Sequence, residues 1–174
     1  MRGGASWLQL RAKTESGAEF LELADAIVAA AAGARVIVND RADIAAMSRA
    51  AGVHVGQDDL AVEDARAIVG PDAIVGVSTH NAAQVREALA TSATYVAVGP
   101  IFETGTKQTG YEPRGLELVR EASGRGKPIV AIGGITIETG PQVISAGASA
   151  VAVISDLMAG DPEDRVRHYL RILA

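Results

Sequence analysis

The sequence contains no cysteine, and aromatic residues make up only 3% of its 174 residues. The absence of cysteine excludes disulfide bonds and metal sites built on thiolate ligands. The sequence also lacks an apolar run long and uncharged enough to span a bilayer, and its first residues, MRGGASW, lack the apolar segment of a signal peptide. We therefore expect a cytoplasmic protein with no membrane partner.

Basic residues are also few, because 16 Lys and Arg stand against 21 Asp and Glu and give a formal net charge of -5. This balance excludes the overall positive field that attracts a nucleic-acid-binding protein to a phosphate backbone, so any anionic ligand must be captured locally. Hydrophobic residues make up 48% of the chain, which is enough for one substantial core. We predict a single domain over residues 1–174.

Apolar runs of strand length alternate with stretches of helical period, a pattern typical of βαβ units in a parallel sheet. Gly33 closes a helix expected over residues 19–32, Asn81 is a candidate N-cap, and Pro162 fits the first turn of a last helix. Seven strands are predicted, at residues 7–11, 35–39, 53–55, 74–78, 95–98, 129–132 and 150–154.

Two architectures fit this alternation, the doubly wound open sheet and the closed barrel. Polar residues follow strand after strand at the carboxyl end. A barrel gathers these strand ends around one opening, whereas an open sheet spreads them along a line, so the pattern favours the barrel. The polar positions are Arg11, Lys13, Asn39, Asp40, residues 57–59, Ser78, residues 104–107, Gly134 and Ser155.

The number of strands is one fewer than a (β/α)8 barrel needs, and the sequence starts only a few residues before its first strand. We therefore predict an α/β fold of the TIM-barrel type that lacks its first strand and helix, with seven βα units present. The strands at 7–11 and 150–154 would then each have an unpaired edge. Such an edge invites aggregation or pairing with another chain, including a second copy in a homo-oligomer.

The motif LQLRAK covers residues 8–13. Strand alternation places Gln9 and Arg11 on one face, with Lys13 just beyond the strand end. The planar donor fork of an arginine and the point charge of a lysine suit a diphosphate. A solvated rim is an equally good interpretation of this motif alone.

Two aspartates follow neighbouring strands, since Asp40 ends IVND and Asp59 ends GQDD. Carboxylates at neighbouring strand ends can share one hard cation, and Mg²⁺ needs few of them because water and phosphate oxygens complete its octahedron. Either aspartate alone could instead be the N-cap of the helix that follows it. The pairing across two strand ends favours a Mg²⁺ site.

Three later segments have features of phosphate sites. GPIFETGTK places two threonine hydroxyls and a lysine within residues 104–107, around Gly105, which permits close approach of the backbone. A loop of this composition is usually only a loop. AIGGI and VISD place Gly134, Ile154 and Ser155 at the ends of the last two strands, where barrels commonly bind phosphate through backbone N–H groups.

Seven motifs in order, from Gly3 to about Leu157, resemble those of the thiamine-phosphate synthase family. LQLRAK is similar to the family's QLR(E/A)K, IVNDR to INDR, VHVGQDDL to HLGQEDL, GVSTH to GVSTH and GPIFETGTK to GPIFPTxTK, and AIGGI and AVISD complete the set. The sequence departs from the family at Asp58, where Glu is common, and at Glu103, where Pro is common. The larger departure is the missing first strand and helix.

The resemblance implies a role for each matching position, with Lys107, Arg11 and Ser78 as the catalytic residues. It implies Mg²⁺ bound by Asp40 and Asp59. The pyrimidine diphosphate would be held by Gln9, Leu10, Arg11, Ala12, Lys13, Asn39, Ser78 and Lys107. The thiazole phosphate would be held by Thr104, Gly105, Thr106, Gly134, Ile154 and Ser155.

The family reaction implied by this resemblance condenses 4-amino-2-methyl-5-(diphosphooxymethyl)pyrimidine with a thiazole phosphate, either hydroxyethylthiazole phosphate or its carboxy form. The products are thiamine monophosphate and pyrophosphate. The transition state has strong pyrimidine cation character, so bond formation needs no general base. The resemblance thus implies a transferase in which Mg²⁺, Arg11, Lys13 and Lys107 neutralise the charge that builds on the departing pyrophosphate.

Other interpretations stay open. His80 is the best candidate if the chemistry were proton transfer, although a histidine at a strand end is more often structural, and His54 and His168 are expected to be structural or on the surface. The nearest rival function is a thiazole tautomerase, a related barrel that needs no diphosphate or metal, and the paired aspartates argue against it. The chain could also be a non-catalytic truncated remnant that folds only with a partner.

Overall fold

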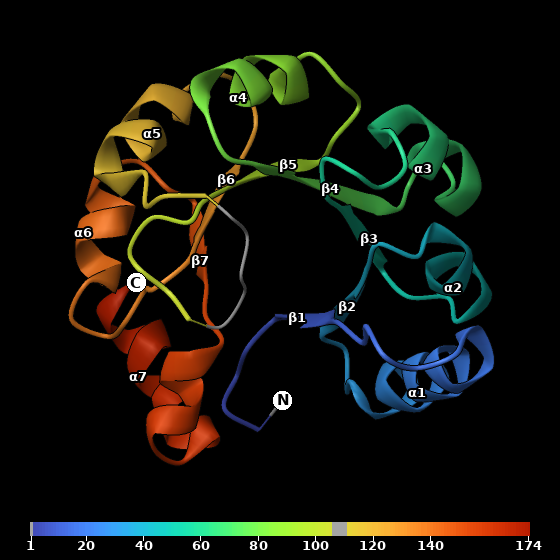
Figure 1. Ribbon diagram of the computed structural model, residues 1–174. Coiled ribbons are helices and arrows are strands. Elements are labelled where there is room, and N and C mark those ends of the chain that lie inside the picture. The colour runs from blue at the N-terminus through green and yellow to red at the C-terminus, as the bar shows by residue number, and fades with distance from the viewer. Residues whose placement is uncertain (1, 106–110) are drawn as a thin grey trace. The chain divides into compact units, whose positions relative to one another are not determined.

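The computed structural model describes residues 2–105 and 111–174, which form two compact units. The first unit comprises residues 5–77 and 91–94, and the second comprises residues 2–4, 78–90 and the described part of 95–174. Seven strands alternate with helices in the described residues, which confirms the predicted α/β pattern (Figure 1). None of the described helices has the length and apolar character needed to cross a membrane.

In the first unit, strands β1 to β4 run parallel and lie in sequence order. Helices α1, α2 and α3 connect consecutive strands and lie beside one another along the same side of them (Figure 1). Strand β3 is buried at every position, whereas β1 is exposed at three of its four. The elements are β1 (Trp7–Leu10), α1 (Gly17–Ala30), β2 (Arg35–Asn39), α2 (Ala42–Met47), β3 (Gly52–Val55), α3 (Val62–Val69) and β4 (Ile74–Thr79).

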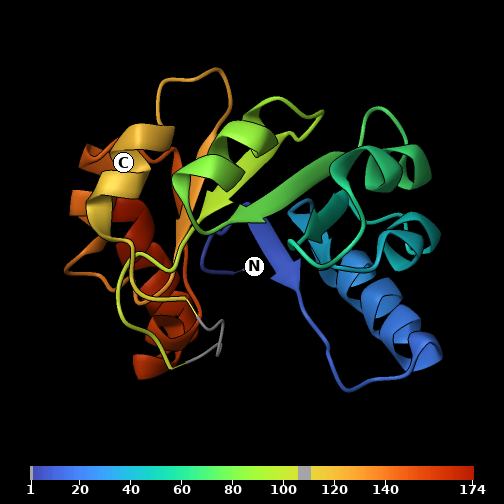
Figure 2. The same ribbon diagram turned by 45° about the horizontal axis from the view of Figure 1, so that its top comes forward.

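The second unit holds the last two residues of β4 and the parallel strands β5 to β7. Figure 2 shows α5, α6 and α7 on the same side of β6 and β7, as Figure 1 does. An apolar cluster that includes Ile101, Val119 and Val143 fills the space between these helices and strands. The elements are α4 (Ala82–Leu89), β5 (Tyr95–Val98), α5 (Gly115–Ala122), β6 (Ile129–Ile132), α6 (Gly140–Ser145), β7 (Ala150–Ala152), the 3-10 helix η1 (Ser155–Ala159) and α7 (Pro162–Ile172).

Side-chain caps determine where three helices begin. Ser16 accepts a hydrogen bond from the backbone N–H of Glu19, and the Glu19 carboxylate accepts one from the Ser16 N–H. This capping box begins α1 two residues before the predicted start. Asn81 accepts a backbone hydrogen bond at 2.9 Å and is the predicted N-cap of α4. Asp161 caps α7, and Pro162 is in its first turn, as predicted.

Two strands end earlier than the sequence predicts. Strand β1 stops at Leu10, where its ladder with β2 ends, so Arg11 lies in the loop that follows. Strand β7 stops at Ala152, because Ile154 has a φ of -124° and a ψ of -77°, outside the extended region, and Ser155 begins η1. The predicted phosphate positions after β7 therefore lie in a helical turn and not at a strand tip.

Candidate active site

Charged side chains lie together in the first unit, after strands β1, β2 and β3. Asp40 directly follows β2 and has a φ of 64°, a left-handed conformation that aspartate tolerates better than most residues. Its backbone N–H donates to the His54 carbonyl oxygen at 2.7 Å, which holds this turn against β3. The Lys13 ammonium contacts the Asp40 carboxylate. The Asp59 carboxylate accepts a hydrogen bond from the Gly56 N–H at 2.8 Å.

Neither aspartate is a helix N-cap. The N-cap residue of α2 is Arg41, that of α3 is Ala61, and neither helix has a side-chain cap hydrogen bond. The N-cap interpretation of Asp40 and Asp59 is therefore wrong. The Asp40 carboxylate contacts Lys13, and the Asp59 carboxylate contacts the Gly56 N–H. Both of these partners lie outside α2 and α3.

Asp40 and Asp59 also interact with each other. Partial burial raises the pKa of the Asp59 carboxyl group, a hydrogen bond from Gly56 opposes this rise, and the neighbouring Asp40 carboxylate adds to it. Two carboxylates that repel each other at short range fit a divalent cation, which would neutralise both. Within residues 2–105 and 111–174, no group of three or more His, Cys, Asp or Glu side chains is placed to hold a metal ion. The assignment of Mg²⁺ to this pair stays a prediction.

The other predicted site residues of the first unit lie on β1, in the loop after it and at the end of β2. Asn39 is the last residue of β2 and is only 9% exposed, so its side chain is fixed by its surroundings. Gln9 on β1 and Arg11 in the following loop are exposed. Leu10 and Ala12 are half-buried. The exposed amide and guanidinium groups are accessible to a ligand from solvent.

In the second unit, hydrogen bonds join the ends of β4 and β5. The Gly99 N–H donates to the Thr79 carbonyl oxygen at 3.1 Å, and the Thr79 hydroxyl donates to the Ala97 carbonyl oxygen at 2.8 Å. Ser78, which the resemblance assigns to the pyrimidine diphosphate, directly precedes Thr79 and is half-buried. Ser78 thus lies on β4 directly before a residue whose backbone and side chain are hydrogen-bonded to the neighbouring chain segment.

His80 is held on two sides. Its Nδ1 atom is 2.6 Å from the Gly99 carbonyl oxygen, and its ring stacks on Tyr111 with the centroids 4.0 Å apart. Because a carbonyl oxygen only accepts, Nδ1 carries the hydrogen. This arrangement supports a structural role for His80. His54 is buried in β3, and His168 is exposed on α7.

The loop after β5 lies against the glycine turn after β6. Gly134 has a φ of 63°, and a Cβ atom there would lie 2.4 Å from the Glu103 carbonyl oxygen. Only glycine fits this position, because an added Cβ would meet the backbone. Thr104 directly follows Glu103, so this contact brings the start of the segment of residues 104–107, here called the threonine loop, close to the glycine turn. Two of the three segments that the resemblance assigns to the thiazole phosphate are thus neighbours in the second unit.

The remaining predicted phosphate residues divide into two groups. Ile154 and Ser155 at the start of η1, and Gly105 in the threonine loop, are exposed. Thr106 and Lys107 lie outside the described residues. Their roles stay predictions.

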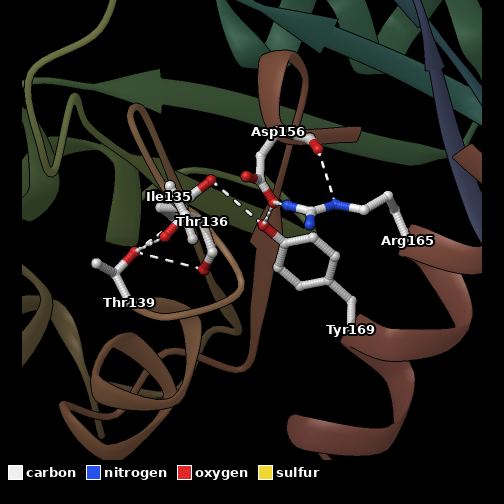
Figure 3. Close-up of polar contacts among 6 residues, drawn as sticks. All are labelled: Ile135, Thr136, Thr139, Asp156, Arg165 and Tyr169. Carbon is white, nitrogen blue, oxygen red and sulfur yellow. Dashed lines mark hydrogen bonds and ion pairs between the residues drawn. The ribbon is translucent and has the colours of Figure 1, made fainter. Parts of the chain in front are cut away.

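Sequence reasoning missed a polar cluster directly beside Ser155 (Figure 3). The Asp156 carboxylate contacts the Arg165 guanidinium and accepts a hydrogen bond from the Tyr169 hydroxyl at 2.5 Å. Arg165 Nε also donates to the Asp156 carbonyl oxygen at 3.0 Å. The available signal was an arginine and a tyrosine four residues apart on α7, which places both on one face of the helix.

Comparison with known proteins identifies the family. A family model described as "Thiamine monophosphate synthase" matches residues 1–157. A protein from Chlorobium luteolum named thiamine-phosphate synthase is 45% identical, over 99% of this chain and 84% of that protein. A protein of the same name from Koribacter versatilis is also 45% identical, over 98% of this chain and 82% of that protein.

Solved structures agree with the sequence comparison. Thiamine phosphate pyrophosphorylase from Pyrococcus furiosus has a TM-score of 0.89 and 30% identity, over 99% of this chain and 84% of that one. 3-Hexulose-6-phosphate synthase has a TM-score of 0.73 over 97% of this chain and 87% of that one, but only 22% identity, so this likeness concerns the fold alone. The chain belongs to the thiamine monophosphate synthase family.

Proposed function

We propose that this chain joins 4-amino-2-methyl-5-(diphosphooxymethyl)pyrimidine to a thiazole phosphate and releases thiamine monophosphate and pyrophosphate. The observation that carries the proposal is the 45% identity, over 99% of the chain, to a relative named thiamine-phosphate synthase. The thiazole substrate is either hydroxyethylthiazole phosphate or its carboxy form, and the carboxy form would also lose its carboxylate as CO2. The reaction is a transfer, and it belongs to thiamine biosynthesis.

In the first unit, we assign the diphosphate to Gln9, Arg11, Lys13 and Asn39 and the Mg²⁺ to Asp40 and Asp59. The repulsion between the two carboxylates and the contact between Lys13 and Asp40 support this assignment. Bound Mg²⁺ would supply positive charge to the diphosphate oxygens. The protein's own cations would add to it, since Arg11 offers a planar donor fork and Lys13 a mobile ammonium.

In the second unit, we assign the thiazole phosphate to the threonine loop, Gly134, Ile154 and Ser155. The close approach of Gly134 to the Glu103 carbonyl oxygen supports this, because Thr104 directly follows Glu103 in the chain. Threonine hydroxyl groups and backbone N–H groups both bind phosphate oxygens well. Ser78 and Lys107 complete the assignment as groups for the pyrimidine diphosphate.

The chemical step breaks the bond between the pyrimidine methylene carbon and the diphosphate oxygen, and the electron pair leaves with pyrophosphate. A bond then forms between the methylene carbon and the thiazole nitrogen. Because no proton moves in this step, the side chains act by orientation and charge. Arg11, Lys13 and Lys107 stabilise the negative charge on the leaving group, which is the largest kind of contribution that such a site makes.

We also propose that the seven βα units belong to a single domain of the TIM-barrel type, acting in the cytoplasm. The exposure of β1 supports this arrangement, since Trp7 is 40% exposed and Leu8 is 37% exposed. Adjacent strand residues point to opposite faces, so both faces of β1 lack full cover. A further βα unit, or a second copy in a homo-oligomer, would provide it.

The decisive experiment mixes both phosphorylated substrates with the protein, with and without Mg²⁺, and follows thiamine phosphate and pyrophosphate by chromatography and mass spectrometry. We expect both products in equal amounts, and only with Mg²⁺. Metal-independent isomerisation of the carboxythiazole phosphate without pyrimidine would support the tautomerase instead. Binding of both substrates without turnover would support the truncated remnant.

A further inference from the structure

We infer that Asp156, Arg165 and Tyr169 position the phosphate-binding backbone around Ser155 and Gly134, an inference that rests on the proposed function. None of the three has a role in the proposed chemical step. They are positioning residues, because they would act on the substrate through the backbone segments that they hold. Figure 3 shows them together between η1, α7 and the loop after β6.

The Asp156 carboxylate on η1 connects these three elements, because it contacts two donors of α7 and accepts a backbone hydrogen bond from Ile137 in the loop after β6. Asp156 Oδ2 receives the Tyr169 hydroxyl at 2.5 Å and contacts the Arg165 guanidinium, and both donors come from α7. The Tyr169 hydroxyl is also 3.4 Å from the Ile135 carbonyl oxygen in the loop after β6. The side chains of Asp156 and Arg165 are only 11% and 23% exposed, so water competes little for these bonds.

The sequence positions of these contacts tie the cluster to the proposed phosphate site. Asp156 directly follows Ser155, and Ile135 directly follows Gly134. Ser155 itself is exposed, and the next residue, Asp156, is held by its side-chain contacts. A shift of η1 would therefore change the distance between the two segments that hold the same phosphate.

Charge balance gives the cluster a second effect. Burial raises the pKa of Asp156, but hydrogen bonds from Tyr169 and Arg165 outweigh it and bring the pKa below its ordinary value. The carboxylate therefore stays ionised one residue from a proposed phosphate contact. Arg165 neutralises this charge, and without it the carboxylate would repel the phosphate.

The test measures steady-state kinetics for each substrate in Arg165→Gln, Tyr169→Phe and the double variant Asp156→Asn/Arg165→Gln. We expect Arg165→Gln to raise the KM for the thiazole phosphate by about 10-fold, because it leaves an uncompensated charge beside the ligand. The KM for the pyrimidine diphosphate should change by less than about twofold. Tyr169→Phe should act in the same direction but more weakly, since it removes one hydrogen bond and no charge. The double variant should recover only the part of the loss that comes from the uncompensated charge, because the charged contact that holds η1 to α7 is still missing.

A matched control is Arg66→Gln in the first unit. Arg66 donates to the carbonyl oxygens of Pro71 at 3.2 Å and Ser92 at 2.9 Å, so its loss should destabilise the fold without a preference for one substrate. A purely structural role for the Asp156 cluster predicts that Arg165→Gln behaves in the same way. Equal changes in both KM values, in proportion to the loss in melting temperature, would overturn the inference.

A second readout separates this inference from the proposed function. Calorimetric titration with hydroxyethylthiazole phosphate, and with inorganic phosphate as a probe, measures binding in the absence of turnover. If the unmodified chain forms no thiamine phosphate, the proposed function fails, and the titration still compares Arg165→Gln with the unmodified chain. Weaker phosphate binding by the variant supports the positioning role, and equal binding contradicts it.

Discussion

Lys13, Asp40 and Asp59 come from three separate loops, and their side chains interact with one another. The carboxylates repel each other, and the Lys13 ammonium relieves part of that repulsion. A divalent cation and a diphosphate would meet both needs at once, because the metal takes the carboxylates and the phosphate takes the ammonium. The same contacts explain why neither aspartate is used as a helix cap.

Asp59→Asn should raise the Mg²⁺ concentration needed for half-maximal activity by more than about 10-fold, since it removes one of two proposed carboxylate ligands. The measurement is a Mg²⁺ titration of product formation at saturating substrates. Asp58→Asn is the matched control, because it removes the same charge one residue away at an exposed position without a proposed role. Identical Mg²⁺ dependence of the two variants would show that Asp59 is not a ligand.

Lys107→Ala should lower kcat by about 10² to 10³, the scale for removal of one group that stabilises transition-state charge. The measurement is initial rate at saturating concentrations of both substrates. Lys127→Ala is the control, because Lys127 precedes β6 in a segment without a proposed role. A change in kcat of less than threefold would contradict the role of Lys107 in this reaction.

Gly134→Ala should destabilise the protein and weaken thiazole phosphate binding, because its Cβ would lie 2.4 Å from the Glu103 carbonyl oxygen. We expect a loss of about 1 to 3 kcal/mol in the free energy of unfolding. Gly124→Ala provides the control, since Gly124 has a φ of 71° with no atom within 4 Å of an added Cβ. Urea unfolding of both variants separates the cost of the positive φ from the cost of the clash. Equal losses in the free energy of unfolding would show that the contact with the Glu103 carbonyl oxygen does not affect stability.

At the scale of elements, a side-chain N-cap contributes more to the stability of a short helix than the helix propensity of a typical single residue does. Asn81→Ala should lower the free energy of unfolding by about 1 kcal/mol, because α4 loses the acceptor for one of its first backbone N–H groups. Asn81→Asp keeps an acceptor and should lose less than half as much. Urea unfolding curves measure both changes. If the two variants lose the same amount, the side-chain cap does not stabilise α4.

The sequence predicts buried strands well and strand ends poorly. Strands β2, β5 and β6 have the predicted bounds, because short apolar runs flanked by breakers leave little choice of register. Strands β1 and β7 end early for reasons outside their own residues: the ladder with β2 stops at Leu10, and the backbone turns at Ile154. Ala32, placed in the predicted first helix, has a φ of 49° and lies beyond its end.

Residues of the candidate site could be predicted from the sequence where they closely follow a predicted strand. Asp40 and Asp59 follow neighbouring parallel strands, and that alone predicts their proximity. The cluster of Asp156, Arg165 and Tyr169 could not be found in this way. An arginine on an amphipathic helix normally indicates a solvated face, and only the packing of α7 against η1 shows that it holds a carboxylate.

At the scale of the whole molecule, the repeated βα unit explains why so many of the proposed functional residues lie shortly after a strand. Each parallel strand is followed by a loop and a helix, so each carboxyl end supplies a loop that can change without disturbing the core. The fold likeness to 3-hexulose-6-phosphate synthase at 22% identity agrees with this division. The strands set the scaffold, and function follows from the loops.

The exposure of β1 leads to a prediction about the thermal stability of the whole chain. Addition of a βα unit in front of β1 should cover Trp7 and Leu8 and raise the melting temperature by about 5 °C or more, given the apolar area to be buried. Trp7 is the one tryptophan of the sequence, so its emission should also move to shorter wavelength. A Gly/Ser extension of equal length is the control, and size-exclusion chromatography shows whether a second copy already covers the strand. Equal melting temperatures and emission maxima for the two extended chains, both monomeric, would mean that β1 needs no further unit beside it.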